Sequence, residues 1–512
     1  MYFLGIDNGG TMTKAALFDE RGCEKACASR KVETFHPQPG WEEVEPESLW
    51  EANVAAIRDV LAISGIAPRE IACVAGAGHG NGLYLVNGVG KPLLGIRSTD
   101  TRARDYVEKW QRDGVTQKLL PKTTQATWPA QPNALLRWLA DFQPEILSQA
   151  QWLFMAKDYI RYRLTGEAFL ERTDASGTSL LNNQTLAYDE TILQAWGIEK
   201  WQSLLPPLAK SCDLCGKITP EAARQTGLLA GTPVAGGMFD IDAVGLAVGM
   251  TEENILCLIS GTWGNNQYIA RKPVVSEDVF MTTCYAMDGF YLMLEGSATS
   301  ASNLEWMIRE FFSADQAWLQ NQGTEKTIYD LVNEEIAQTP PEEGNLVFLP
   351  YLYASPVHPD AKGALLGLEG WQRRGHLLRA LCEGIVFGHG WHVERLLRHW
   401  QTSAETGKPP LPDTIRLAGG AARSPVWSQM FADILQTTVQ IPEGTELGAF
   451  GAAIAASVAC GAYPNLPTAC REMVRLTRIY TPNPELAEVY ARKQRRFRQL
   501  LEILRPHWTS LR

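Results

Sequence analysis

The sequence has little of what would tie a protein to nucleic acid or to a membrane. Its 512 residues carry 57 acidic side chains against 47 Lys and Arg, which gives a net charge of -10. This balance argues against nucleic acid or an anionic membrane surface as a partner. The longest apolar run, residues 447–463, consists largely of Ala and Gly and is interrupted by Ser457. That composition predicts a tightly packed core helix and not a membrane span.

Cysteine is too sparse and too scattered to suggest a metal site. The chain has ten cysteines, and its one Cys-x-x-Cys, Cys212 to Cys215, has no second pair at a spacing suited to zinc. No signal peptide precedes the apolar segment that begins at Tyr2. Together these features favour a cytoplasmic protein with free thiols.

Two common nucleotide-binding fingerprints are also missing. No Gly-x-Gly-x-x-Gly follows the predicted strand at residues 71–75, and no Gly-x-x-x-x-Gly-Lys-Ser/Thr occurs in the chain. The composition, 45% apolar and 20% charged, is that of an ordinary globular protein, and the length predicts at least two domains.

The first nineteen residues form the most informative stretch. Residues 2–6 predict a buried strand that ends at Asp7, and residues 14–18 predict a return strand. The turn between them contains Gly9 and Gly10, which allow successive N–H groups to point into one concavity that holds a phosphate. A carboxylate facing that anion requires a divalent cation between them, so Asp7 implies Mg²⁺. An ordinary hairpin turn is the alternative.

A second copy of this pattern occurs half a chain later. Residues 255–260 predict a strand, Gly261 and Thr262 form the turn, and the chain returns through residues 268–270. The repeat indicates two similar halves, each with a phosphate-binding hairpin. A third glycine pair, Gly419–Gly420, follows a predicted strand at 414–417 and would let a flat ligand approach the backbone.

The order of the first elements is that of an α/β fold. Three strands, the third at residues 25–35, precede a helix that starts near Pro46 and a strand at 71–75. The glycine-rich loop that follows carries His79 and Asn81, which suit a polar small-molecule site, although a structural role in the loop is the alternative.

Two later polar segments are weaker candidates. Asp100 and Arg102 follow a predicted strand and could bind vicinal hydroxyls, or form a solvated turn. Residues 173–178 predict a polar loop whose Asp174 and Ser176 could line a cleft, or form a hydrogen-bonded turn.

Asp240 is the candidate base. A tight turn at residues 236–239 precedes it, and it opens a predicted helix at residues 241–248. A helix N-terminus stabilises an ionised carboxylate, and such a group can accept a proton from an alcohol during phosphoryl transfer. The alternatives are that Asp240 only caps the helix or that Asp242 has the role.

Several of these segments, in this order, resemble motifs of the FGGY carbohydrate kinases. Residues 5–19 resemble the first phosphate motif, residues 236–243 the catalytic Gly-x-x-Asp segment, and residues 259–264 the second phosphate motif. Residues 363–384 are similar to the C-terminal signature of the family, and residues 417–435 are similar to its adenosine segment.

The resemblance implies an α/β, actin-like (ribonuclease H-like) fold with two similar domains around a central cleft, and transfer of phosphate from ATP with Mg²⁺. Residues 1–250 would form the domain with the sugar site and the first phosphate hairpin. Residues 251–512 would carry the second hairpin, the adenosine site and terminal helices from about residue 470. The partner is a small sugar, with no nucleic acid and no membrane, and a homodimer is common in the family.

Roles carry over where residues match the family. Asp240 would be the base and contact the substrate, and Asp7 would hold Mg²⁺. The residues implied to surround the phosphates are Thr11, Thr13, Lys14, Gly261 and Thr262; those against the adenosine are Gly419, Gly420 and Ala421; those at the sugar are His79, Gly80, Asn81 and Asp100. The chain departs from the family pattern at residues 8–10, at Trp263 and at Leu135.

The central segments are most similar to ketose kinases of the L-xylulose and 3-keto-L-gulonate type. A polyol kinase of the erythritol or glycerol type is the alternative within the family. The alternative from another class is an actin-like ATPase that acts as a conformational switch, and such a protein would hydrolyse ATP at the same rate with or without sugar.

Overall fold

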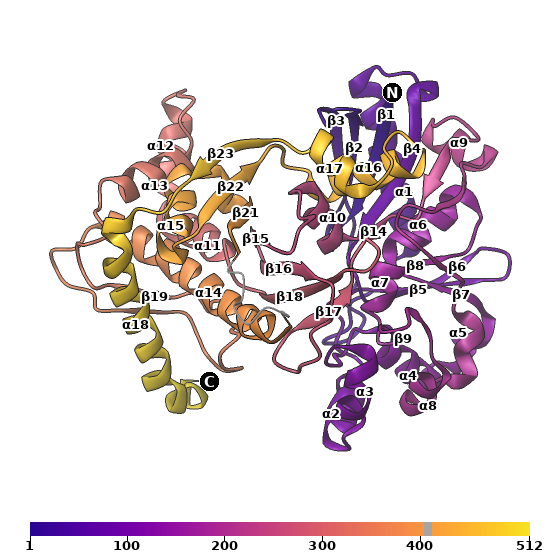
Figure 1. Cartoon of the computed structure of the whole chain (residues 1–512), viewed down its shortest axis with the longest axis horizontal. Helices are drawn as coiled ribbons and strands as arrows, with labels where there is room; N and C mark the ends of the chain where they lie inside the picture. Colours follow the sequence, from indigo (N-terminus) through magenta and orange to yellow (C-terminus); the bar gives the residue numbers. More distant parts are fainter. Residues whose placement is uncertain (404–411, 512) are drawn as a thin grey trace. The chain divides into compact units, whose positions relative to one another are not determined.

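The computed structural model describes residues 1–403 and 412–511 (Figure 1). The chain forms two compact units, each built from three segments. Unit 1 comprises Met1–Thr251, Ile269–Met293 and Gly444–Val474, and unit 2 comprises Glu252–Tyr268, Leu294–Glu443 and Arg475–Arg512.

A seven-stranded sheet forms the centre of unit 1. β1 (Tyr2–Asn8) pairs antiparallel with β2 (Met12–Asp19), and β2 pairs antiparallel with β3 (Glu24–Lys31). β1 also pairs in parallel with β4 (Ile71–Gly78). The predicted order of three antiparallel strands, a helix and a further strand is therefore confirmed. The sheet is completed by β13 (Pro233–Ala235) and β14 (Met238–Phe239), which both pair with β4, and by β12 (Leu214–Lys217).

Helices cover this sheet. α1 (Pro46–Ser64) contacts β2 and β3, whereas α16 (Leu447–Ala459) contacts β1 and β4 and also packs on α10 (Asp240–Ala247). Small residues allow α16 this close approach, because a Cβ at Gly5 would lie 1.8 Å from the Ala449 carbonyl oxygen. The prediction of a tightly packed core helix is confirmed. Among the described residues no helix is long and apolar enough to span a membrane.

The rest of unit 1 packs around a three-stranded sheet in the order β6-β5-β7, with β5 at Leu83–Asn87, β6 at Pro92–Ile96 and β7 at Ala150–Phe154. The surrounding core is rich in Leu and Trp. The other elements of unit 1 are α2 (Arg104–Arg112), α3 (Val115–Thr123), α4 (Pro132–Phe142), α5 (Pro144–Gln149), α6 (Ala156–Thr165), β8 (Leu170–Glu171), α7 (Arg172–Ser176), β9 (Leu181–Asn182), β10 (Ala187–Tyr188), α8 (Glu190–Trp196), β11 (Leu208–Ala209), α9 (Pro220–Thr226), β17 (Met281–Cys284) and α17 (Leu466–Met473).

The segment predicted as a polar loop at residues 173–178 begins inside a helix, so that prediction is wrong for residues 173–176. α7 forms because the Glu171 carboxylate accepts the backbone N–H groups of Thr173 and Asp174 and caps the helix. Ser, Thr, Asp and Asn are the preferred caps, so a cap at Glu171 could not be predicted from the residue type.

Unit 2 repeats the strand order of unit 1. β15 (Ile255–Ser260) pairs antiparallel with β16 (Gly264–Ala270) and in parallel with β21 (Thr414–Gly419). β22 (Thr438–Pro442) is parallel to β21, β23 (Leu476–Tyr480) closes that edge, and β18 (Tyr291–Ser297) lies beside β16. The order β18-β16-β15-β21-β22 matches β3-β2-β1-β4-β13, which confirms two similar halves.

The remaining elements of unit 2 are α11 (Ser302–Phe311), α12 (Ser313–Asn321), α13 (Ile328–Ala337), β19 (Val347–Leu349), β20 (Ala364–Leu366), α14 (Arg374–Ser403), α15 (Pro425–Leu435) and α18 (Ala487–Leu504). α15 begins after Ser424, whose side-chain hydroxyl oxygen accepts the Trp427 N–H and caps the helix.

Candidate active site

Three strands of unit 1 end at one edge of its sheet and bring two carboxylates to the same place. Asp7 on β1 pairs with Ala77 on β4, and Ala77 pairs with Met238 on β14. All three strands are parallel, so their carboxyl ends meet at this edge. Asp240 stands two residues beyond the level of Asp7 and begins α10.

Asp240 is half-buried and is the first residue of α10, whereas Phe239 occupies the N-cap position. Burial raises the pKa of Asp240 well above its usual value, and the charges of Asp7 and Asp174 add to the effect. The helix start favours the ionised form of Asp240, but burial has the larger effect on its pKa. A carboxylate with a raised pKa is a stronger base.

Asp242, the competing candidate, is already engaged. It is fully buried, and its Oδ1 accepts the backbone N–H of Ala286 at 2.9 Å. Its position therefore favours a structural role, and Asp240 is the better placed of the two carboxylates.

Asp7 is held at the start of α16. A Cβ at Gly448 would lie 2.4 Å from Asp7 Oδ2, so the close approach of the helix requires glycine. Burial raises the pKa of Asp7 to about 6; the charge of Lys14 opposes this and that of Glu446 adds to it. Its Oδ1 is buried and accepts no hydrogen bond from the described residues.

This open carboxylate oxygen fits a Mg²⁺ ion. Across the described residues no group of three or more His, Cys, Asp or Glu side chains could hold a metal. Mg²⁺ needs no such group, because it commonly takes one or two carboxylates, substrate phosphate oxygens and water. Asp7 therefore suits the Mg²⁺ contact that the sequence predicts for it.

The three predicted phosphate contacts of unit 1 differ in availability. Thr11 is exposed in the β1–β2 turn. Thr13 is fully buried, with its hydroxyl 3.1 Å from Asn8 Oδ1 and 3.0 Å from Asn53 Oδ1. Lys14 Nζ forms an ion pair with Glu446 at 2.7 Å. Thr11 is thus the most available of the three, and the roles of Thr13 and Lys14 stay predictions.

The glycine-rich loop lies against the residue that precedes Asp240. A Cβ at Gly80 would come within 2.5 Å of Phe239 Cζ. Asn81 has a positive φ of 64°, and its buried Oδ1 has no partner among the described residues. His79 is 7% exposed, and burial, with the charge of Arg97 as a second cause, lowers its pKa to about 4. The fold brings His79, Gly80 and Asn81 together with Asp240.

Asp100 has a different environment. Its carboxylate accepts the Glu42 N–H at 2.7 Å and pairs with Arg102, whose Nη2 lies 2.9 Å from Oδ2. Both side chains are fully buried. This geometry favours a structural ion pair over a solvated turn, and contact between Asp100 and a substrate stays a prediction.

A buried charge cluster behind the site was not found from the sequence. Lys157 Nζ lies 3.0 Å from Asp158, 3.5 Å from Glu171 and 3.1 Å from Asp174. The cluster reaches the site through Thr173, whose hydroxyl donates to Glu171 and accepts the Phe239 N–H at 2.8 Å. The adjacent Lys157 and Asp158 at the start of α6 can be read from the sequence. Their distant partners cannot.

Unit 2 brings its own predicted residues together. Ser260, just before the Gly261–Thr262 turn, pairs with Gly419. Gly419 has a φ of 85°, and a Cβ there would lie 2.5 Å from the Ser260 carbonyl oxygen. Gly420 is exposed and Ala421 is buried in the following turn of 3-10 helix. The second phosphate turn and the predicted adenosine segment are therefore neighbours.

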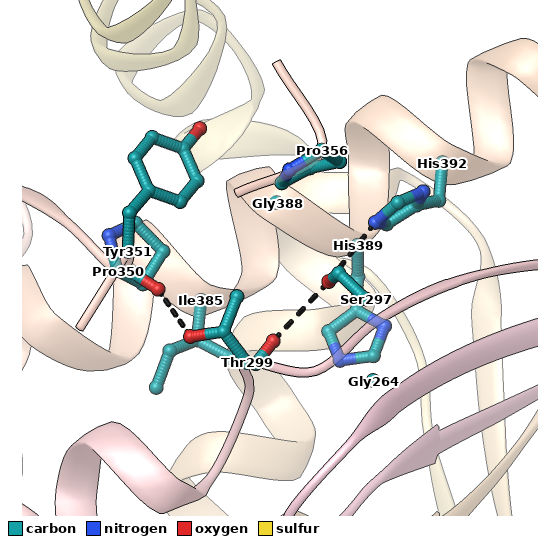
Figure 2. A pocket seen from close by; sticks show the side chains of 10 residues that line it. All are labelled: Gly264, Ser297, Thr299, Pro350, Tyr351, Pro356, Ile385, Gly388, His389 and His392. Carbon is teal, nitrogen blue, oxygen red and sulfur yellow. Dashed lines mark hydrogen bonds between the residues drawn. The ribbon is translucent and has the colours of Figure 1, made fainter. Parts of the chain in front are cut away.

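A small cavity beside this turn contains two histidines (Figure 2). His389 connects Ser300 and Asn266, at 3.0 and 2.7 Å, and burial lowers its pKa to about 3. His392 lies 2.9 Å from Glu295 Oε2 and 3.2 Å from Ser297 Oγ. These bonds support the strands behind the turn, so both histidines have a structural explanation.

The fold of two repeated units, with a glycine-rich hairpin in each, is that of the actin-like ATPases, and solved structures agree. A xylulose kinase from Lactobacillus acidophilus superposes with a TM-score of 0.86 at 25% identity, and the match covers 100% of both chains. A Plasmodium falciparum glycerol kinase with ADP gives 0.82 at 19% identity, covering 97% of each chain, and supports the fold alone.

Family models match most of the sequence. The N-terminal domain of the FGGY family of carbohydrate kinases matches residues 2–246, and its C-terminal domain matches residues 256–460. The chain belongs to this family. It is 35% identical to the L-xylulose/3-keto-L-gulonate kinase of Escherichia coli, over 98% of this chain and 97% of that protein. It is 32% identical to a probable L-xylulose kinase of Pasteurella multocida, over 98% and 99%.

The chain is therefore an ATP-dependent sugar phosphotransferase, as the motifs predicted. An ATPase switch without a sugar acceptor finds no support in these matches.

Proposed function

We propose that this chain transfers the γ-phosphoryl group of ATP to a hydroxyl of a small keto sugar, either a ketopentose such as L-xylulose or a keto-sugar acid such as 3-keto-L-gulonate. Asp240 is the general base that takes the proton of the attacking hydroxyl. The observation that carries the proposal is the position of Asp240 at the sheet edge, beside the Gly80 turn and near Asp7.

The protein has few chemical tasks in this reaction. In phosphoryl transfer most of the catalysis comes from positioning and from neutralising charge. His79 stays neutral at pH 7 because burial depresses its pKa, so its ring can accept or donate a hydrogen bond to a sugar hydroxyl. Thr173 holds the Phe239 backbone immediately before Asp240, and the Phe239 ring packs on Gly80.

The Mg²⁺ ion of Mg-ATP would be held by Asp7, and when bound it neutralises phosphate charge. The proposal assigns the phosphates to Thr11, Gly261 and Thr262 and the adenosine to the segment beginning at Gly419. Exposed backbone N–H groups at such turns bind phosphate without a cationic side chain.

A screen of sugar-dependent ADP release tests the proposal. Purified protein is assayed with L-xylulose, D-xylulose, L-ribulose, 3-keto-L-gulonate, erythritol and glycerol. We expect a keto sugar to give the highest kcat/KM. A preference for erythritol or glycerol would instead establish the polyol alternative, and equal ADP release with and without every sugar would refute a kinase. We also propose a homodimer, as the family resemblance implies, and light scattering on the same sample tests it.

A further inference from the structure

Arg97 is a buried cation without a hydrogen-bond partner in the described part of the chain. Its side chain is 2% exposed, and none of its three guanidinium nitrogens has a hydrogen-bond partner among the described residues. Its backbone is fixed, because the Arg97 N–H donates to the Glu42 carbonyl at 2.9 Å. Arginine stays charged in proteins, and a buried charge is costly unless it is paired. Such a residue points to an anionic ligand.

A second buried arginine, five residues later, is paired with carboxylates and contrasts with Arg97. Arg102 Nη2 lies 2.9 Å from Asp100 and 2.8 Å from Glu43, and its guanidinium stacks 4.1 Å from the centre of the Trp41 ring. Asp100 and Glu43 are therefore committed to Arg102. Among the described residues no carboxylate pairs with Arg97.

Arg97 lies at the proposed sugar site. Its charge acts on His79, where it adds to the effect of burial, and on the hydroxyl of Tyr84, which is 3.4 Å from His79 Nε2. The strand pairing gives the position directly, because Ile96 pairs with Leu83 and a Cβ on Gly82, next to Asn81, would lie 3.0 Å from the Arg97 carbonyl carbon. His79 belongs to the turn that packs on Phe239, immediately before Asp240.

Other buried polar groups without partners lie in the same region. Gly82 contacts two segments of this region. Its N–H donates to the Ala130 carbonyl at 2.8 Å, and a Cβ on it would lie 3.0 Å from the Arg97 carbonyl carbon. The turn around Ala130 thus meets the Arg97 backbone at Gly82. Around this turn, the buried groups without partners among the described residues include Asn81 Oδ1, Trp128 Nε1, and both Asn133 Oδ1 and Nδ2.

Together these groups match one class of molecule. Amide and indole groups hydrogen-bond to hydroxyls, whereas a guanidinium prefers a carboxylate, with which it forms short, charge-assisted hydrogen bonds. We propose that Arg97 binds the carboxylate of a sugar acid, while Asn81, Trp128 and Asn133 bind its hydroxyls. This inference rests on the proposed function, and it selects the keto-sugar acid over the neutral ketopentose.

The test compares Arg97→Met with Arg102→Met, a buried arginine of the same segment that has partners within the chain. ADP release is measured with 3-keto-L-gulonate and with L-xylulose. We expect wild type to have the higher kcat/KM for the acid. Arg97→Met should lower the ratio of the two kcat/KM values about 100-fold, chiefly through KM for the acid. Arg102→Met should lower both values together.

Melting temperature supplies a readout that does not depend on turnover. Without ligand, Arg97→Met should melt at or above the wild-type temperature, because it removes an unpaired buried charge, whereas Arg102→Met should melt lower. The acid should raise the melting temperature of wild type but not that of Arg97→Met.

An equal loss of kcat/KM for both sugars in Arg97→Met, or a melting temperature as low as that of Arg102→Met, would overturn the proposal and make Arg97 structural. Failure of the proposed function looks different: wild type would release no ADP with either sugar. In that case the melting shift with 3-keto-L-gulonate, present in wild type and lost in Arg97→Met, would still support the carboxylate site, and its absence would refute it.

Discussion

The ring of Phe239 occupies the space that a side chain at Gly80 would need, since a Cβ there would come within 2.5 Å of Cζ and 2.6 Å of Cε2. The Phe239 backbone is fixed by its N–H bond to Thr173. The contact therefore sets the distance between the turn that carries His79 and Asn81 and the carboxylate of Asp240.

Gly80→Ala should damage catalysis more than stability. The added methyl displaces the Phe239 ring, and overpacking of this kind costs about 1 to 3 kcal/mol. We expect kcat/KM to fall at least ~10-fold, because small displacements at a reacting centre are costly. Steady-state kinetics and thermal melting measure both effects. Gly88→Ala is the control, since a Cβ there meets only Gln151 Oε1, at 3.9 Å; equal kinetics in the two variants would contradict this account.

Lys157→Met should destabilise unit 1 strongly. Lys157 is 1% exposed and pairs with Asp158, Glu171 and Asp174, and Asp158 also pairs with Arg161. Removing one partner from a buried ion pair costs about 3 to 5 kcal/mol, because the remaining charges are left unpaired. Chemical unfolding measures the loss. Lys122→Met, which breaks a half-exposed pair, should cost less than about 1 kcal/mol.

A small loss in Lys157→Met, similar to that of Lys122→Met, would mean that water or structural adjustment compensates the cluster. It would also remove the argument that this cluster fixes Phe239.

The local parts of this architecture could be predicted from the sequence. The β1–β2 and β15–β16 hairpins follow from an apolar strand, a glycine turn and a return strand, all within twenty residues. The start of α10 at Asp240 is equally local, and the predicted helix at residues 447–463 corresponds to α16.

Contacts between distant segments could not be predicted. Gly448 packs on Asp7 although 440 residues separate them, and Gly82 packs on the backbone of Ile96 and Arg97. Nothing in the residues around Arg97 shows that Asp100 pairs with Arg102 instead. The burial that raises the pKa of Asp240 also comes from packing between distant segments. The sequence shows only the helix start, which lowers this pKa.

His79 should make stability depend on pH. Its pKa is about 4 in the folded protein, against an ordinary value of 6.5. Between these values the unfolded chain binds a proton that the folded chain does not, so stability falls as the pH drops from 6.5 towards 4. At pH 5 the loss is about 2 kcal/mol.

Replacing His79 with Gln should remove this pH-dependent loss of stability. The stability difference between wild type and His79→Gln, measured by chemical unfolding, should therefore shrink by about 2 kcal/mol between pH 7.5 and pH 5. Parallel stability curves over this range would show that the folded and unfolded proteins bind this proton equally well, and they would contradict the lowered pKa of His79.

Asp7→Ala should change the dependence of activity on magnesium. If Asp7 supplies the protein's ligand to the ion, its loss should raise the Mg²⁺ concentration for half-maximal ADP release more than ~10-fold. The control is Asp19→Ala, because Asp19 ends β2 of the same hairpin but is bonded to Lys25 and to backbone N–H groups. An unchanged magnesium titration in Asp7→Ala would exclude the assignment.

The most direct test is the turnover of Asp240→Asn, which keeps the size of the side chain and removes the base. With the best sugar from the screen, we expect kcat to fall by about 10³-fold or more, while the affinity for ATP stays within about threefold of wild type. A variant that retains kcat within tenfold of wild type would contradict the claim that Asp240 takes the proton of the sugar hydroxyl.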